Sequence, residues 1–273
     1  MNFTDRLRQS QENHNSLICV GLDPDPLKLP RHLQGNDDGV AQFCRGIIGA
    51  TKDVACAFKL NLAFFESLGD RGTAVLREVL AAVPKDIITI ADGKRSDIGN
   101  SSAMYARSIM TDLRFDSATV HPYMGFDSVE PFAKDPSQGV FVLALTSNPG
   151  AKDLQYLKIG GKPLYEHVVR KVKSWNTAGN FGLVVGATRP VQLKQIRTLA
   201  PKMPLLIPGI GAQGGDLRKA VKDGCDATGA LAVINVGRSI LFASSGEDYA
   251  DAARTAALAL REEIGRYREQ YFG

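Results

Sequence analysis

The stretch DIITIADGKRSDIGN, residues 86–100, joins a predicted buried strand to a charged turn and then to a helix. Residues 87–91 are apolar or β-branched without clean alternation, which is typical of a parallel strand covered on both faces. The segment 100–113 then has helical periodicity. Between strand and helix, four charged residues occupy six positions: Asp92, Lys94, Arg95 and Asp97.

Further apolar runs of similar length recur along the chain, so that eight strands are predicted in all. Their ranges are 16–23, 54–61, 86–94, 117–125, 139–148, 181–188, 204–212 and 230–239. Segments with helical periodicity lie between most of them, at 40–52, 66–83, 100–113, 163–175, 189–199, 214–224 and 247–264. After the fourth strand the segment is short and interrupted by Pro131, and the longest irregular stretch, 146–163, follows the fifth.

Eight strands that alternate with helices over 273 residues predict an α/β fold, a (β/α)8 TIM barrel. We expect a single domain over residues 1–273, with a short N-terminal helix before the first strand. A doubly wound open sheet is the alternative. Because no GxGxxG turn follows the first strand, the dinucleotide-binding version of that sheet is disfavoured.

The composition narrows the classes of partner. Hydrophobic residues make up 44% and charged residues 23%, which suits a globular protein with a full core. A net charge of +4 is too balanced to suggest nucleic acid, although it is compatible with a small anionic ligand. Residues 1–16 lack the apolar region of a signal peptide, and no apolar run approaches the ~20 residues that span a bilayer. Neither secretion nor membrane insertion is expected.

The cysteines indicate a reducing compartment. Cys19, Cys44, Cys56 and Cys225 form no CxxC pair and have no histidine at zinc-finger spacing. Two of them lie inside apolar runs, where cysteine behaves as a small hydrophobic residue. We therefore expect a cytoplasmic protein without a metal site of this kind.

Charged residues gather at the carboxyl ends of the second and third strands, where barrel enzymes hold their active sites. Because side chains alternate along a strand, Asp92 and Lys94 should share the inward face, and Lys59 should reach the same place from the second strand. The structural alternatives are a rim ion pair for Asp92 and Lys94 and a helix N-cap for Asp97. Two lysines and two aspartates together are costly to bury unless all are paired, which favours a functional site.

Glycine-rich turns follow the last two strands. GAQGG (211–215) leads into a helix, so its backbone N–H groups can face an anion. VGRS (236–239) offers the Gly237 N–H and the Arg238 guanidinium. Turns after the seventh and eighth strands are the usual phosphate site of this barrel, which favours phosphate binding over glycine that only turns the chain. A lone histidine, His121, is interpreted as structural.

These motifs together resemble orotidine 5'-monophosphate decarboxylase. The resemblance rests on six stretches: LDPDP (22–26), FKLNLAFFE (58–66), DGKRSD (92–97), LTSNPG (145–150), PGIGAQGG (208–215) and VGRSI (236–240). It extends from Leu22 to Ile240 and is similar to the longer bacterial (type 2) subfamily. Gly93, Ser96 and Ser101 replace residues that are commoner in the family, and none of them is charged.

The resemblance implies decarboxylation of orotidine 5'-monophosphate to UMP and carbon dioxide, the last step of de novo UMP synthesis, without metal or cofactor. Lys94 would stand beside C6, stabilise the carbanion and donate its proton. Asp92 would face the departing carboxylate, and Lys59 would hold Asp92. Preorganised charge is the main catalytic lever that such a site offers.

The resemblance also implies the residues that bind substrate. Asp23 and Lys59 would contact ribose, Ser147 and Pro149 the pyrimidine. The phosphate would be held by three residues: Gln213, Gly237 and Arg238. The partner subunit of a homodimer would contribute Asp97, Ile98 and Ser101.

Two rivals from other classes are weighed against this interpretation. Magnesium-dependent decarboxylases and synthases of the same superfamily act on sugar phosphates and carry a glutamate at the end of the second strand. Here that region reads KLNLA (59–63), with Lys59 and no carboxylate. A non-catalytic phosphate-binding barrel would be expected to lack at least one of the charged residues, and all are present.

Overall fold

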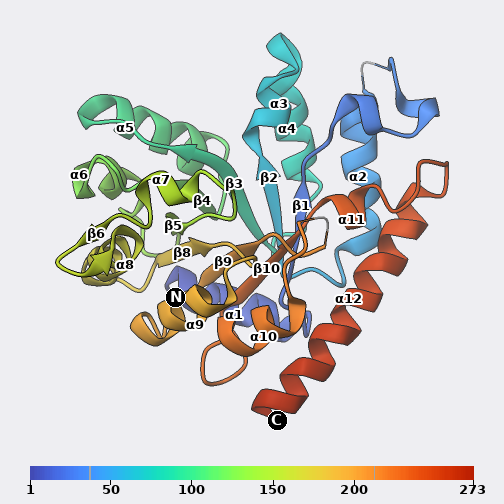
Figure 1. Ribbon diagram of the computed structural model, residues 1–273. Helices are drawn as coiled ribbons and strands as arrows, with labels where there is room; N and C mark the ends of the chain where they lie inside the picture. Colours follow the sequence, from blue (N-terminus) through green and yellow to red (C-terminus); the bar gives the residue numbers. More distant parts are fainter. Residues whose placement is uncertain (37, 212) are drawn as a thin grey trace.

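Eight parallel strands close into a barrel in the computed structural model, which describes residues 1–36, 38–211 and 213–273 (Figure 1). Around the barrel the order is β1-β10-β9-β8-β5-β4-β3-β2. The strands are β1 Ile18–Leu22, β2 Ala57–Asn61, β3 Ile88–Arg95, β4 Ser117–Val120, β5 Gly139–Leu145, β8 Phe181–Val185, β9 Leu205–Pro208 and β10 Ala232–Val236. The predicted (β/α)8 barrel is confirmed, and the open-sheet alternative is wrong because β1 pairs with β10.

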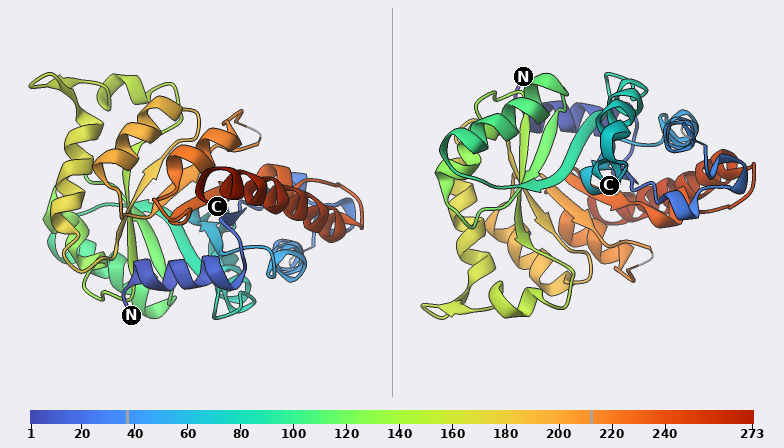
Figure 2. Two further views of the ribbon diagram at one scale, coloured as in Figure 1. Left: turned by 90° about the horizontal axis from the view of Figure 1, so that it is seen from below. Right: turned by 90° about the horizontal axis from the view of Figure 1, so that it is seen from above.

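Helices lie around the strands, as the end-on views of Figure 2 show. They are α1 Phe3–Asn13, α2 Gly39–Thr51, α3 Leu62–Glu66, α4 Gly72–Ala81, α5 Gly99–Ala106, α6 Phe126–Val129, α7 Ala151–Leu154, α8 Leu164–Trp175, α9 Pro190–Leu199, α10 Leu217–Gly224, α11 Arg238–Leu241 and α12 Tyr249–Phe272. A π-helical turn, Arg107–Asp112, continues α5. Among the described residues, no helix is both long and apolar enough to cross a membrane.

Three sequence predictions about these connections need correction. The single helix predicted over 66–83 is wrong, because Gly69 takes a φ of +63° and separates α3 from α4. The last helix continues to Phe272 instead of ending at 264, because Tyr267 and Phe272 still pack against the core. The stretch 146–163 is not irregular throughout: it holds α7 and a hairpin of β6 (Lys158–Ile159) and β7 (Lys162–Pro163).

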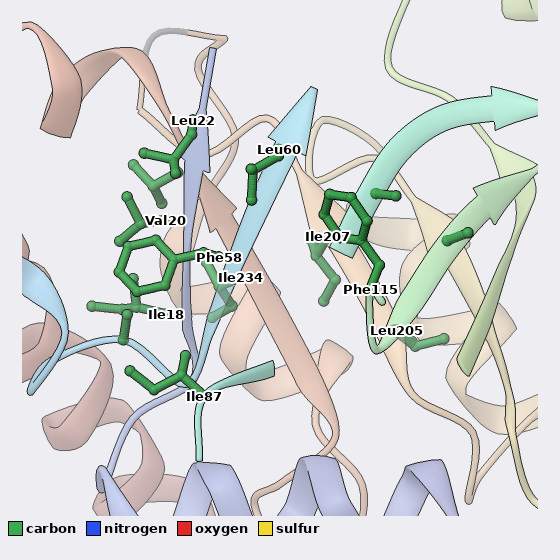
Figure 3. Close-up of a cluster of buried hydrophobic side chains, with 14 of the residues drawn as sticks. Ile18, Val20, Leu22, Phe58, Leu60, Ile87, Phe115, Leu205, Ile207 and Ile234 are labelled. Carbon is green, nitrogen blue, oxygen red and sulfur yellow. The ribbon is translucent and has the colours of Figure 1, made fainter. Parts of the chain in front are cut away.

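Apolar side chains fill both sides of the strands. On the outer side, β1 turns Ile18, Val20 and Leu22 toward the helices, where they are fully buried (Figure 3). On the inner side, Cys19 of the same strand joins a separate cluster with Phe141 and other residues inside the barrel. Burial of each large apolar side chain contributes about 1.5–3 kcal/mol, so the two layers hold the strand ends in fixed positions.

Helix α1 closes the amino-terminal end of the barrel, below the strands in the view of Figure 1. Phe3 is fully buried and meets Phe141 edge to face, with ring centroids 5.7 Å apart. Ser10 Oγ donates to the Cys56 carbonyl at 2.8 Å, and Gln11 Nε2 donates to the Ala232 carbonyl at 2.8 Å. With this end filled by α1, the barrel interior can open to a ligand at its other end.

Candidate active site

A cavity of about 1150 Å³ opens at the carboxyl ends of the strands. Six of the residues predicted from the sequence line it: Asp23, Lys59, Asp92, Lys94, Ser147 and Gln213. Its floor is apolar, with Leu143, Val184 and Leu206 from three different strands. The cavity therefore combines a charged wall with an apolar base, as ligand sites in enzymes commonly do.

The charged wall is a connected network centred on Asp92. Lys59 Nζ lies 2.7 Å from Asp92 Oδ2, and Lys94 Nζ lies 2.6 Å from Asp92 Oδ1. Lys59 Nζ also lies 3.7 Å from Asp23 Oδ1. The Lys59 side chain is 5% exposed and that of Lys94 is 45% exposed. One ammonium is thus locked inside the network while the other faces the open cavity.

Burial and pairing act in opposite directions on this network. Burial alone would lower the pKa of Lys59, but the Asp92 and Asp23 carboxylates outweigh it and hold that pKa above its ordinary value. Burial alone would raise the pKa of Asp92, but Lys59 and Lys94 hold it well below its usual range. Both groups of this central ion pair are therefore charged at neutral pH.

Strand β3 bulges where it delivers Lys94. Ala91 pairs with Ala118 and Arg95 with Val120, so four residue steps on β3 face two on β4. Within the bulge Lys94 has a φ of +47°, a left-handed conformation that is uncommon for lysine. The regular alternation expected from the sequence is therefore absent at this point. The ammonium nevertheless returns to Asp92, because the bulge re-aims the side chain.

Thr119 on β4 was missed by the sequence analysis. Its hydroxyl lies between the bulge and the carboxylate, donating to Asp92 Oδ1 at 2.9 Å and accepting from the Lys94 amide at 3.0 Å. Threonine is common in strands, so only its inward register beside Asp92 could have indicated a role. His121, which was interpreted as structural, also lines the cavity, and burial and then Lys94 lower its pKa.

The predicted base- and phosphate-binding residues lie on three adjacent loops. Ser147 Oγ donates to Gln213 Oε1 at 3.0 Å, which links the loop after β5 to the loop after β9. Gly237 caps the short helix α11 and lies against Gly21 and Asp23, whereas Arg238 begins that helix with an exposed side chain. Three of the predicted residues are not part of the cavity lining: Pro149, Gly237 and Arg238. Of the predicted turn 211–215, Ala212 lies outside the described residues.

The residues predicted to come from a partner subunit lie outside the lining of this cavity. Asp97, Ile98 and Ser101 do not line it, and Ile98 is 58% exposed. Asp97 Oδ1 accepts from the Ile98 amide at 2.8 Å, while α5 begins at Gly99 with Ile98 as its N-cap. The alternative that Asp97 is the N-cap of the helix is therefore wrong.

No cluster of three or more His, Cys, Asp or Glu side chains is placed to hold a metal ion within the described ranges. At the carboxyl end of β2, where the magnesium-dependent rival predicts a glutamate, the strand ends in Asn61, two residues after Lys59. Asn61 Oδ1 accepts from the Ala63 amide at 3.3 Å and so begins α3.

A parallel barrel with a charged cavity at the carboxyl ends of its strands defines the class of (β/α)8-barrel enzymes. A family model described as "Orotidine 5'-phosphate decarboxylase / HUMPS family" matches residues 16–254. The chain belongs to this family.

Similar proteins extend the match to nearly the full length. The chain is 46% identical to an orotidine 5'-phosphate decarboxylase of Dehalococcoides mccartyi, covering 99% of this chain and all of that protein. It is 47% identical to the Azoarcus sp. protein of the same name, covering 98% of this chain and all of that protein.

Solved structures agree with these sequence matches. The OMP decarboxylase of Leishmania donovani superposes with a TM-score of 0.87 at 40% identity, covering 98% of this chain and 99% of the other. The UMP synthase of the same organism gives 0.89 at 42% identity, but this chain spans only 57% of that longer one.

Proposed function

We propose that this chain decarboxylates orotidine 5'-monophosphate to UMP and carbon dioxide, the last step of de novo UMP synthesis. The observation that carries the proposal is the Lys59–Asp92–Lys94 network in the cavity of a chain of this family. Two lysines around one aspartate form a site with fixed charges, whose donors are in place before substrate arrives. Such preorganised charge is the largest single contribution to many enzymatic rates.

Substrate would bind across the cavity mouth. Gln213, the Gly237 amide and Arg238 would hold the phosphate at the loops after β9 and β10, the usual phosphate site of this barrel. Asp23 and Lys59 would contact ribose, which suits a carboxylate oxygen, Asp23 Oδ1, that is buried without a hydrogen-bond partner among the described residues. Ser147 and Pro149 would contact the pyrimidine.

The reaction breaks the bond between C6 and its carboxylate, leaves the electron pair on C6 and releases carbon dioxide. A carbanion at that carbon has no adjacent π-system to accept its charge, so it needs a nearby cation. The half-exposed ammonium of Lys94 supplies that cation and then transfers one proton to C6, which yields UMP and a neutral amine that solvent reprotonates. Neither a metal nor a cofactor takes part in these reaction steps.

Asp92 would face the substrate carboxylate while Lys59 and Lys94 keep it charged. Loss of carbon dioxide removes the negative charge closest to Asp92, so repulsion falls as the reaction proceeds. The short contacts of Asp92 with both lysines keep it in place during this change.

The site would be completed by Asp97, Ile98 and Ser101 of a second subunit in a homodimer. The surface around α5 supports this part of the proposal, because it exposes an unusual number of large apolar side chains: Ile98, Met104, Tyr105, Tyr123, Met124 and Phe126. Segments α5 and α6 are neighbours; Met104 and Tyr105 lie on α5 and Phe126 on α6, while Tyr123 and Met124 also line the cavity. Apolar patches of this kind mark protein–protein interfaces.

The test is a spectrophotometric assay with orotidine 5'-monophosphate in buffer containing EDTA, with UMP identified as product. Rapid loss of substrate absorbance would support both the reaction and its independence from metal. Absence of turnover there, together with turnover of a sugar phosphate after addition of magnesium, would overturn the proposal in favour of the magnesium-dependent rival.

A further inference from the structure

The hydroxyl of Thr119 connects the two groups on which the proposed chemistry depends. It accepts a hydrogen bond from the Lys94 amide at 3.0 Å and donates one to Asp92 Oδ1 at 2.9 Å. A hydroxyl has a single proton, and the Lys94 amide can only donate, so the direction of both bonds is fixed. The Thr119 side chain is buried, with the residue 1% exposed, so water does not compete for these bonds.

The position of Thr119 relative to the bulge explains why a hydroxyl is needed there. It is the single β4 residue that faces the three β3 residues Asp92, Gly93 and Lys94, between the paired positions on either side. In a regular parallel pair, every second amide of a strand donates to a backbone carbonyl of that neighbour. Inside the bulge, the Lys94 amide donates to the Thr119 side chain and not to a strand carbonyl.

The same hydroxyl also limits the movement of Asp92. Oδ2 of Asp92 is held by Lys59, whereas Oδ1 is shared between Lys94 and Thr119. If the ammonium of Lys94 leaves Oδ1 to act on a substrate, Thr119 is the donor that stays there. The carboxylate can then keep its orientation while the lysine moves.

We infer that Thr119 is a positioning residue, which holds Lys94 in its left-handed backbone conformation and keeps Asp92 oriented when the Lys94 ammonium turns to substrate. The inference rests on the proposed function for its catalytic consequence. Its geometric part, the conformation of the bulge, stands on the hydrogen bonds alone.

The test compares Thr119→Val, which keeps the shape and removes the hydroxyl, with Thr119→Ser, which keeps the hydroxyl. Misplaced catalytic groups lower kcat, so we expect Thr119→Val to reduce kcat about 10- to 100-fold with little change in KM. Thr119→Ser should restore most of kcat. Ser117→Ala is the matched control, because Ser117 is a buried hydroxyl on the same strand that donates to the Thr89 carbonyl, away from Lys94 and Asp92.

Crystal structures of both variants supply a readout that does not depend on activity. Lys94 should leave the left-handed region in Thr119→Val and keep it in Thr119→Ser, and Thr119→Ala serves if the valine variant does not fold. Wild-type kcat in Thr119→Val, or an equal loss in Ser117→Ala, would overturn the inference. Wild-type protein that fails to turn over orotidine 5'-monophosphate would instead refute the proposed function. The crystal structures would then decide the geometric part, and a left-handed Lys94 in Thr119→Val would overturn it.

Discussion

The amino-terminal and carboxyl-terminal ends of the barrel both hold aspartates surrounded by cations and hydroxyl groups. At the amino-terminal end, Asp116 accepts from Arg6 Nη2 at 2.5 Å and from Thr89 N and Oγ1 at 2.9 and 2.7 Å. At the carboxyl-terminal end, Asp92 accepts from two lysines and one threonine at similar distances. The local chemistry of the two carboxylates is therefore much the same.

The two networks differ in whether they border the cavity and in whether a carboxylate oxygen lacks a hydrogen-bond partner. Helix α1 contributes Arg6 to the first network, which lies outside the cavity lining, and both carboxylate oxygens of Asp116 accept hydrogen bonds within the protein. The second network borders the cavity, with Lys94 half-exposed and a buried oxygen of Asp23 without a hydrogen-bond partner among the described residues. The comparison teaches that a paired aspartate is no sign of function by itself. Access to a cavity separates the proposed catalytic network from the structural one.

The largest effect is expected from Lys94→Ala, which removes the ammonium proposed to stabilise the carbanion. Decarboxylation should fall about a thousandfold or more, since loss of even one preorganised donor costs 10²–10³ in kcat. Steady-state kinetics and circular dichroism would check this loss in a folded protein. Lys171→Ala, at an exposed position on α8, is the control. Near-normal turnover by Lys94→Ala would end the distinction between the two networks.

A mixture of Lys94→Ala and Asp97→Ala subunits tests whether the open end is completed by a second chain. Each variant alone should be almost inactive. A heterodimer places both defects in one site and leaves the other site intact, so random mixing should restore about a quarter of wild-type activity. Purified heterodimers, with one intact site of two, should reach about half of wild-type activity, and activity measurements would check both values. Heterodimers as inactive as the parents would mean that Asp97 acts within its own chain.

At the closed end, Phe3→Ala should damage stability rather than catalysis. The ring is fully buried between α1 and β5, so its removal should cost about 3–5 kcal/mol of unfolding free energy. Urea unfolding would measure the loss, and kcat of the remaining folded protein should match wild type. Leu27→Ala, at an 88% exposed position, is the control. A fall in kcat without loss of stability would contradict the purely structural role of this end of the barrel.

Asp226→Asn tests the closed end through pH. Burial alone would raise the pKa of Asp226, but hydrogen bonds from Arg8, Ala230 and Thr228 lower it below the unfolded value of about 3.9. The stabilisation by the charged form is thus present above that pH and is lost as pH falls through the folded pKa. The variant should lose about 1–3 kcal/mol at pH 7, since hydrogen bonds to charged groups contribute that much.

The difference between wild type and Asp226→Asn should therefore narrow below about pH 4. Urea unfolding at pH 7, 5, 4 and 3 would measure it. Asp70→Asn changes an exposed carboxylate on the turn before α4 and should leave stability nearly unchanged at each pH. A difference between wild type and Asp226→Asn that is constant with pH would show that the carboxylate charge is not what stabilises this end.

The strands and the charged end of the barrel could be predicted from sequence because buried strands have a distinctive, apolar composition. Strands covered on both faces read as continuous apolar runs, so the eight strands were found and Lys59, Asp92 and Lys94 were expected at one end. The sequence also contains a weaker indication of structure in the loop after β5. Gly160 and Gly161, both with positive φ, form the two-residue turn of the β6–β7 hairpin that the sequence analysis missed.

What could not be predicted depends on geometry that no residue type announces. The bulge in β3 changes the pairing register, and neither Asp92 nor Lys94 differs chemically from a residue in a regular strand. Thr119 has the composition of an ordinary strand residue, and its role follows only from lying opposite that bulge. The roles proposed for Asp97, Ile98 and Ser101 concern a second chain and stay predictions.

The pairing of β1 with β10 has a consequence for synthesis of the chain. Ile18 is aligned with Ile234, so one edge of β1 stays unpaired until nearly the whole chain has been synthesised. Such distant pairings slow folding, and an apolar strand edge is prone to association while it is exposed. On the ribosome, β1 therefore cannot pair with β10 until residues 232–236 have emerged, and its edge stays open to association during that interval.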